Sequence, residues 1–249
     1  MKLTHVIIFI FFSTLFSLTG CNSQNQDVAS LQQVTAKQTK TPIIVDGLLD
    51  EDAWNNAQSL QLSENKTGVV INDSAYSTSV FISYDNTNLY IAFICNDRDI
   101  FSTFTQHDEY LWQQDAVEVF IDTDENPNTY VEIEVSPNNV LFDSYIVNPV
   151  DIDIPETLKF NLSGIRTAVT VDGTVNERQD EDKQWIVEIS IPFSELVENF
   201  DPAMISNFVW KINFYRLDAD NDGPHAYAWS PTLIKRFHHP TRFGRLYFE

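Results

Sequence analysis

The sequence predicts an all-β protein, a two-sheet antiparallel β-sandwich or jelly roll with one or two short helices. Short segments that alternate apolar and polar residues recur from residue 77 to the C-terminus, and a period of two is typical of strands with one buried face. Turn residues separate these segments, and helix signals are few. Many short strands with turns between them are typical of two packed sheets.

The expected strands share this alternation. In chain order they are residues 77–84, 89–95, 116–122, 130–135, 140–147, 166–171, 184–191, 208–217 and 244–249. The first two are joined by Asp85-Asn86-Thr87-Asn88, which predicts a hairpin. In AVEVFID (116–122), the three aliphatic odd-numbered positions face one side, and Glu118, Phe120 and Asp122 face the other. Short helices are expected at 50–57, capped by Asp50, and at 192–200, which begins with proline.

The N-terminal residues 1–20 read as a secretory signal peptide. Lys2 is followed by an almost wholly apolar run, Val6 to Leu18, and then by LTGC (18–21). The run is too short and too early for a stable membrane span. LTGC resembles the lipobox of bacterial lipoproteins, which implies cleavage before Cys21, lipidation of that cysteine and membrane attachment through the lipid only. An ordinary signal peptide with a chance cysteine is the alternative.

Residues 21–40 are polar and lack a sustained period, so we expect a flexible tether from lipidated Cys21. Asn22 follows the cysteine. By analogy with lipoprotein sorting, it implies the outer membrane of a bacterial cell envelope. The remaining residues, 41–249, are expected to form one domain, a normal length for an all-β fold.

Charge and cysteine content exclude some classes of protein. The chain has 36 acidic and 15 basic residues, a net charge of −21, which repels phosphate backbones and argues against a nucleic-acid partner. This charge suits a neutral ligand, a divalent cation or simple solubility. Cys21 and Cys95 are the two cysteines. Because Cys95 lies in the apolar stretch LYIAFIC, we expect a buried, inert thiol.

The chain has no motif for nucleophilic, zinc-dependent or phosphate-binding chemistry, since GxSxG, HExxH, CxxC and glycine-rich loops are absent. His238-His239 could hold a metal or lie in a solvated loop. Carboxylates are therefore the remaining catalytic candidates, and a glycoside hydrolase would use Glu118 with Glu132 or Glu134. The alternative is that these glutamates form a wet, polar sheet face.

The segment DADNDG (218–223) matches the first half of a calcium loop, with oxygen ligands from Asp218, Asp220 and Asp222. Trp229 stands where the bidentate glutamate of a helix–loop–helix site should be. A structural Ca²⁺ and a solvated turn both remain open.

Trp112 differs from the other strand-associated tryptophans. It lies in the polar context LWQQ, whereas Trp185 and Trp210 lie within apolar alternation and are expected in the core. An exposed indole flanked by amides offers a flat face and hydrogen-bonding groups, which a sugar ring requires. A half-buried loop tryptophan is the alternative.

Six ordered segments together resemble the family 9 carbohydrate-binding modules, β-sandwich domains akin to the DOMON domains. The segments are IIVDGLLDEDAW, YDNTNLYIAF, LWQQDAVEVFID, WIVEISIPF, INFYRLDAD and AWSP…HHPTRFGRL, and they span nearly all of residues 41–249. The resemblance implies a jelly roll with structural calcium that clamps a mono- or disaccharide between two aromatic rings.

The resemblance also implies roles for particular residues. Trp112 matches the first ring, Phe237 falls where the second ring is expected, and Glu118 matches a carboxylate that binds sugar hydroxyls. Asn213 and Tyr215 fall on a strand that supplies further polar contacts. Two departures are evident: Phe237 stands where the family usually has tryptophan, and Glu132 where a family strand carries an arginine contact.

These observations favour a non-catalytic carbohydrate-binding lipoprotein that captures mono-, oligo- or polysaccharides, with no catalytic residue of its own. Its expected partners are glycoside hydrolases or transporters. A xylanase-like glycoside hydrolase is the enzymatic alternative. A haem-binding electron carrier is a third class, because the DOMON group includes cytochromes; it would require Met204, the one methionine left after signal cleavage.

Overall fold

A computed structural model describes residues 31–221 and 223–249. The predicted signal peptide (1–20), the lipidation site Cys21, the tether as far as residue 30, and Asp222 of the predicted calcium loop lie outside the described residues. Within the described part of the chain, no helix is long and apolar enough to cross a membrane.

Thirteen strands dominate the described residues. They are β1 (Gln33–Gln38), β2 (Leu60–Gln61), β3 (Ser63–Glu64), β4 (Thr78–Tyr84), β5 (Asn88–Asn96), β6 (Ala116–Asp122), β7 (Thr129–Val135), β8 (Leu141–Val147), β9 (Arg166–Asp172), β10 (Gln184–Pro192), β11 (Val209–Asp220), β12 (Gly223–Ala228) and β13 (Gly244–Phe248). The helices are short: α1 (Asp52–Asn56), α2 (Ile154–Thr157) and α3 (Phe193–Leu196), with 3-10 turns η1 (Ser74–Tyr76), η2 (Leu111–Gln113), η3 (Pro202–Asn207) and η4 (Pro240–Arg242).

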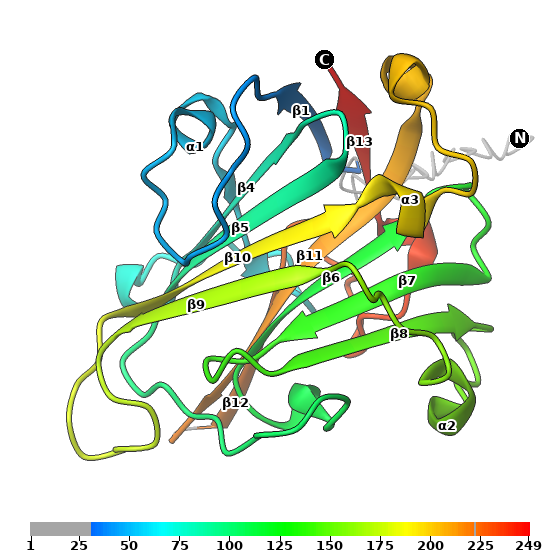
Figure 1. The fold of residues 1–249 in the computed structure, drawn as a ribbon. Coiled ribbons are helices and arrows are strands. Elements are labelled where there is room, and N and C mark those ends of the chain that lie inside the picture. The colour runs from blue at the N-terminus through cyan, green and yellow to red at the C-terminus, as the bar shows by residue number, and fades with distance from the viewer. Residues whose placement is uncertain (1–30, 222) are drawn as a thin grey trace, which may run out of the picture. The chain divides into compact units, whose positions relative to one another are not determined.

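The strands form two sheets that share β1 (Figure 1). Sheet A has the order β8-β7-β6-β11-β13-β1, and β12 and β3 continue it beside the C-terminal half of β11. Sheet B has the order β1-β4-β5-β10-β9, with β2 beside β4. Strand β1 pairs in parallel with β13 through residues 33–36 and with β4 through residues 37–38, while the other ladders of the described chain are antiparallel. The predicted β-sandwich is confirmed.

The main core lies between the inner faces of the two sheets. The aliphatic odd-numbered positions of β6 point into it, as the alternation predicts. Phe93 of β5 meets Phe214 of β11 edge-on, with ring centroids 6.0 Å apart. Trp185 and Trp210 are fully buried, which confirms their expected packing role. Each large apolar side chain buried in this way stabilises the fold by roughly 1.5–3 kcal/mol.

The outer face of sheet A is also covered, which corrects the expectation of a wet, polar face. Phe120, Tyr130, Tyr215 and Phe243 form a second apolar cluster there. The loop between β12 and η4, residues 229–239, contributes to this cover through Phe237. Every residue of β6 is therefore buried, on both of its faces.

The predicted elements are largely confirmed. All nine expected strands form, and β4 and β5 make the expected antiparallel hairpin. Helices α1 and α3 occupy the two expected segments, although α3 is shorter than predicted and Pro192 is its N-cap. Cys95 is fully buried, and burial raises the pKa of its thiol to about 12, as an inert core cysteine requires.

The boundary of the predicted tether is wrong, because residues 33–38 form β1. Val34 and Ala36 are buried between the sheets, so the folded domain includes residues placed in the tether. This strand has one large apolar side chain and several polar ones. Its ladders with β13 and β4, rather than a strong local pattern, hold it in place.

Candidate functional site

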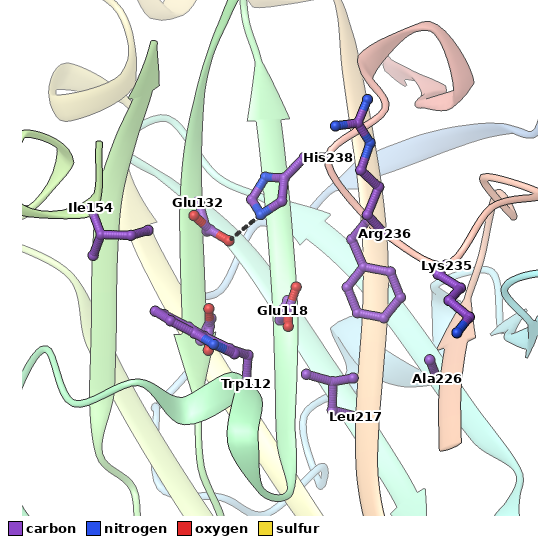
Figure 2. A pocket seen from close by; sticks show the side chains of 11 residues that line it. Trp112, Glu118, Glu132, Ile154, Leu217, Ala226, Lys235, Arg236 and His238 are labelled. Carbon is purple, nitrogen blue, oxygen red and sulfur yellow. Dashed lines mark ion pairs between the residues drawn. The ribbon is translucent and has the colours of Figure 1, made fainter. Parts of the chain in front are cut away.

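A cavity of about 370 Å³ lies on the outer face of sheet A (Figure 2). Its floor comes from β6 and β7, and its walls come from η2, α2, the β11–β12 hairpin and the loop 229–239. The lining residues are Trp112, Glu118, Glu132, Glu134, Ile154, Leu217, Ala226, Lys235, Arg236, Phe237 and His238. Four of the six residues expected to bind sugar are therefore brought together from segments far apart in the sequence.

Trp112 forms one wall and is held from behind by other aromatic rings. It is the central residue of η2. The first residue of η2, Leu111, is fully buried. The indole stacks on Tyr110 at 4.6 Å and meets Phe142 edge-on at 5.3 Å. Trp112 is half-buried and lines the cavity. Because its surroundings restrict the ring, the ligand does not have to order it.

Phe237 forms a second wall from the loop 229–239. Its ring stacks on Tyr215 with centroids 4.1 Å apart and planes 16° apart. The Tyr215 hydroxyl donates to the Phe237 carbonyl at 3.1 Å, which fixes the backbone of the loop as well as its ring. Phe237 is 8% exposed, so only a small part of it is open to a ligand.

Asn213 and Tyr215 support this wall and do not line the cavity, which corrects their expected role as direct sugar contacts. Both are fully buried. The Asn213 amide donates to the Tyr215 hydroxyl at 2.7 Å and to the Ser230 carbonyl at 2.8 Å, and its oxygen accepts from the backbone N–H of Phe214 and Ser230. These bonds satisfy the polar groups beneath the loop, and none of them points to a ligand.

Three glutamates form the floor. In the ladder between β6 and β7, Glu118 lies directly opposite Glu134, and Glu132 lies two residues before Glu134 on the same face. One carboxylate oxygen from each lies within 4.8 Å of the others. Glu118 is 2% exposed, Glu134 is 1% exposed and Glu132 is 4% exposed. The sequence indicated this shared face, because period-two alternation places residues 132 and 134 on one side of the strand.

Burial raises the pKa of all three carboxyls. The pKa of Glu118 is raised well above its ordinary value by burial and by the charge of Glu132. That of Glu134 is raised by burial and by the charges of Glu118 and Glu132, with partial opposition from the Trp112 backbone N–H. Burial raises the pKa of Glu132 to about 7, against a hydrogen bond from Ser144 at 2.9 Å. The cluster therefore shares protons near neutral pH.

His238 lies above this floor and is neutral at pH 7. Burial and the nearby charge of Arg236 lower its pKa to about 4. Burial raises the pKa of Tyr130, so this phenol keeps its proton, and its hydroxyl is hydrogen-bonded to Nδ1 of His238, 2.6 Å away. The other ring nitrogen of His238, Nε2, faces Glu132 Oε1 at 3.8 Å (Figure 2). The sequence indicated His238 only as part of a metal pair or a solvated loop, because the fold of this loop has no local signal.

The remaining lining residues set the character of the rim. Trp112 and Ile154 lie on one side of Glu118, and Leu217 and Ala226 on the other (Figure 2). Lys235 and Arg236 are exposed at the rim, and their charged ends point away from Glu118 and Glu132 (Figure 2). The sequence did not predict Ile154, Leu217, Ala226, Lys235 or Arg236 as lining residues, since their positions depend on how α2, the β11–β12 hairpin and the following loop fold over the sheet. Met204, which a haem site would require, is 48% exposed on η3 and does not line the cavity.

A second buried cluster lies at one end of the inner core. Arg216 is fully buried, and its Nη2 lies 2.9 Å from both Asp97 Oδ2 and Asp218 Oδ2. Asp115 lies in the same group of carboxylates, and it accepts backbone N–H bonds from Phe101 at 2.6 Å and Ala219 at 2.7 Å. We refer to these residues as the Arg216 cluster.

This arrangement bears on the predicted calcium ligands. Asp218 directs one oxygen to Arg216, whose guanidinium already supplies the positive charge that a cation would bring. Asp220 lies partly buried on β11 and accepts from the Asn221 backbone N–H at 3.0 Å. A calcium ion requires six to eight oxygen ligands, and Asp218 does not fit such a set while it is paired with Arg216.

The floor of the cavity is suited to holding a ligand. Glycosidases place two carboxyls on opposite sides of a bond, separated by about 5–5.5 Å or about 6.5–9.5 Å. The three glutamates instead lie side by side on one sheet face, with one oxygen of each within 4.8 Å of the others, so they do not flank a bond from opposite sides. An aromatic wall beside hydrogen-bonding carboxyls is instead the arrangement with which proteins bind polar rings.

Fold and cavity together define a β-sandwich binding module. Comparison with known proteins gives the family: the model for "Carbohydrate family 9 binding domain-like" matches residues 45–249. The chain therefore belongs to this carbohydrate-binding family.

Individual proteins are similar to this chain at low identity. An "Extracellular protein" from Arthroderma benhamiae is 26% identical over 180 residues, which are 69% of this chain and 78% of the relative. A protein from Bacteroides uniformis to which carbohydrate binding is ascribed has a TM-score of 0.65 at 19% identity, covering 88% of this chain and all of the other.

Two structures of a family 9 module from Caldicellulosiruptor kristjanssonii are also similar. One contains cellotriose and the other glucose, each with a TM-score of 0.59, at 15% and 16% identity. They cover 88% of this chain and 94% and 96% of the module, respectively. At these identities, the structures show a shared fold.

Proposed function

We propose that this protein is a non-catalytic carbohydrate-binding module that holds a sugar ring between Trp112 and Phe237, above Glu118, Glu132 and Glu134. The observation that carries the proposal is the cavity itself, in which two aromatic walls from distant segments meet over a polar floor. The sugars named for the Caldicellulosiruptor module, glucose and cellotriose, indicate the scale of ligand to try first.

The expected affinity is modest. Ring contacts and a few hydrogen bonds to charged groups, each worth about 1.5–3 kcal/mol, must exceed the cost of ordering the ligand. The result is a dissociation constant on the order of micromolar to millimolar. Attachment to a surface compensates for such weak binding, because it raises the local concentration of sites.

The binding site is tested by calorimetric titration with a panel of mono- and oligosaccharides. We expect Trp112→Ala to weaken binding about tenfold to a hundredfold. Tyr145→Ala is the matched control, because Tyr145 is a 39% exposed aromatic residue of β8 that does not line the cavity. The proposal fails if no sugar binds, or if Trp112→Ala binds as well as the native protein.

We further propose that Cys21 carries the lipid anchor, that the segment after it tethers the module to the outer membrane, and that the captured glycan passes to partner glycoside hydrolases or transporters. The proposal rests on the LTGC motif and on Asn22. Metabolic labelling with a fatty-acid analogue should mark the native protein and not Cys21→Ala. Labelling of both, or of neither, would contradict it.

A hydrolase remains the second candidate because the raised pKa values of Glu118 and Glu134 would allow either residue to act as a general acid. Turnover of aryl glycosides or xylan that disappears in Glu118→Gln would establish this activity. Sugar binding without turnover supports the non-catalytic function.

A further inference from the structure

The floor of the cavity holds more carboxyl groups than a neutral sugar would require. Glu118, Glu132 and Glu134 converge within 4.8 Å and are almost fully buried. Both carboxylate oxygens of Glu134 are buried and have no hydrogen-bond partner of normal geometry among the described residues. A buried polar group without a partner is costly, and Glu134 lines the cavity, so this partner is missing at the place where a ligand would sit.

No protein cation balances these carboxylates within the described chain. Lys235 and Arg236 lie at the rim with their charged ends directed away from the floor (Figure 2), and neither forms an ion pair with any of the three glutamates. His238 faces Glu132 but is neutral at pH 7. A positive charge on the floor would therefore have to come from the ligand, in place of the protons that the cluster holds.

The shape of the cavity distinguishes a ring-bearing cation from a metal ion. A calcium ion requires six to eight oxygen ligands within about 2.6 Å, and aromatic walls supply none of them. The cavity measures about 370 Å³ and is lined by Trp112, Phe237 and Leu217 as well as by carboxylates. Aromatic faces pack against the C–H side of a sugar and also attract an ammonium group.

We propose that the ligand is an amino sugar, a hexosamine with a free, protonated amine, whose ammonium group binds Glu134 together with Glu118 or Glu132 while its ring packs against Trp112. This inference rests on the proposed function, and it goes further by stating the charge of the ligand. Binding is an ion-pairing step: the ammonium N–H groups donate to carboxylate oxygens, and no covalent bond forms or breaks.

The inference predicts a direction for the effect of pH. An ammonium ligand selects the ionised carboxylates, so protons held by the cluster must leave when it binds. Affinity should rise as pH increases toward about 7, the pKa of Glu132, and fall again once the sugar amine loses its proton. A neutral sugar has no reason to release these protons. Within the cluster, Glu134 faces Glu118 and Glu132, and Glu132 accepts a hydrogen bond from Ser144. The other titratable or charged groups that face the cluster are Tyr130, Tyr215, Arg236, Lys235 and His238.

The test is calorimetric titration of the intact protein with glucosamine, N-acetylglucosamine and glucose, three sugars that differ only at the second carbon. We expect glucosamine to bind at least about tenfold more tightly than either neutral sugar at about pH 7. Titration in two buffers of different ionisation enthalpy should show proton release with glucosamine only. Glu134→Gln keeps the shape of the side chain and should lower the glucosamine-to-glucose affinity ratio about tenfold.

Glu198→Gln is the matched control, because Glu198 is exposed and does not line the cavity. It removes the same unit of charge and should leave the ratio unchanged. An equal fall in both variants would assign the preference to net charge and overturn the inference. Equal or tighter binding of the neutral sugars would overturn it as well, while leaving the proposed function intact.

Two further outcomes would also overturn the inference. If no sugar binds at all, the proposed function fails together with this inference. If Ca²⁺ alone binds the native protein and Glu134→Gln abolishes that binding, the floor is a metal site and the amino-sugar inference is overturned.

Discussion

Two groups of buried carboxylates lie on opposite faces of sheet A, and strand β11 contributes to the surroundings of both. In the Arg216 cluster, Asp97 and Asp218 share a guanidinium, and Asp115 receives two backbone N–H groups. On the cavity floor, no cationic side chain of the described residues pairs with the three glutamates, and Glu134 has no hydrogen-bond partner of normal geometry, the Trp112 backbone N–H being its one weak donor. The carboxylates on the inner face are thus paired with a cation, although Asp218 Oδ1 and Arg216 Nε have no hydrogen-bond partner among the described residues, whereas the carboxylates on the outer face line a cavity.

This difference indicates a structural role for the Arg216 cluster, in contrast to the ligand-binding role that we propose for the cavity floor. Buried ionic groups that satisfy one another serve the fold, and removing one member leaves the others uncompensated. Buried groups without a partner beside a cavity are available to a ligand. Arg216 compensates the charge of Asp218 only in part. Burial raises the pKa of Asp218 to about 6, although Arg216 opposes the rise.

The largest expected effect comes from breaking the compensated cluster. Arg216→Met keeps much of the side-chain volume but leaves Asp97 and Asp218 buried without their cation. We expect a loss of about 3–5 kcal/mol in the free energy of unfolding, measured by urea denaturation. Arg245→Met is the control, because Arg245 pairs with Glu125 at the surface with 38% of its side chain exposed, and we expect about 1 kcal/mol or less. Similar losses in the two variants would mean that the Arg216 cluster is not a stabilising unit.

The second expected effect is a pH dependence from the cavity floor. The folded-state pKa values of the three glutamates are raised, so their protonated forms stabilise the folded state. The contribution of Glu132 is lost as pH rises through about 7, its folded-state pKa. We expect the free energy of unfolding of the native protein to fall by about 2 kcal/mol between about pH 5.5 and pH 8. Denaturation at a series of pH values measures it. Asp218, with a pKa of about 6, contributes in the same direction.

A single substitution isolates the contribution of the floor. Glu134→Gln removes one uncompensated charge, so we expect the variant to be more stable than the native protein at about pH 8, by on the order of 1–2 kcal/mol, and its pH dependence to be flatter. Paired urea titrations of the two proteins at about pH 5.5 and pH 8 provide the measurement. A loss of stability at the higher pH would show that Glu134 has a structural partner, and would remove the contrast between the two clusters.

The smallest expected effect is that of calcium. The prediction for Asp218, Asp220 and Asp222 stands as a prediction, but the pairing of Asp218 with Arg216 leaves few free oxygens for an ion. We expect millimolar Ca²⁺, compared with a chelator, to shift the thermal midpoint by less than about 2 °C. A larger shift that is lost in Asp220→Asn would place a calcium ion at the β11–β12 hairpin and require Asp218 to leave Arg216.

Sequence patterns predicted the strands well because alternation is a local property. In 116–122, the residue order alone separated the core-facing aliphatic positions from Glu118 and Phe120. Strand β1 escaped prediction because its two parallel ladders, and not its composition, hold it in place. The role of Tyr215 was also misjudged, since the sequence cannot show that Phe237 would fold down and cover it.

The sequence by itself determined the β-sandwich, the family and the core faces of the strands, and it singled out Trp112, Glu118 and Phe237, which line the cavity. These follow from periodicity and from ordered motifs, which are written in neighbouring residues. Only the tertiary structure decided that Glu118, Glu132 and Glu134 are buried together without a paired cation among the described residues, and that Asp218 pairs with Arg216. Both outcomes depend on which segments meet and which charges are buried together, because compensation of a buried carboxylate is set by its neighbours in space.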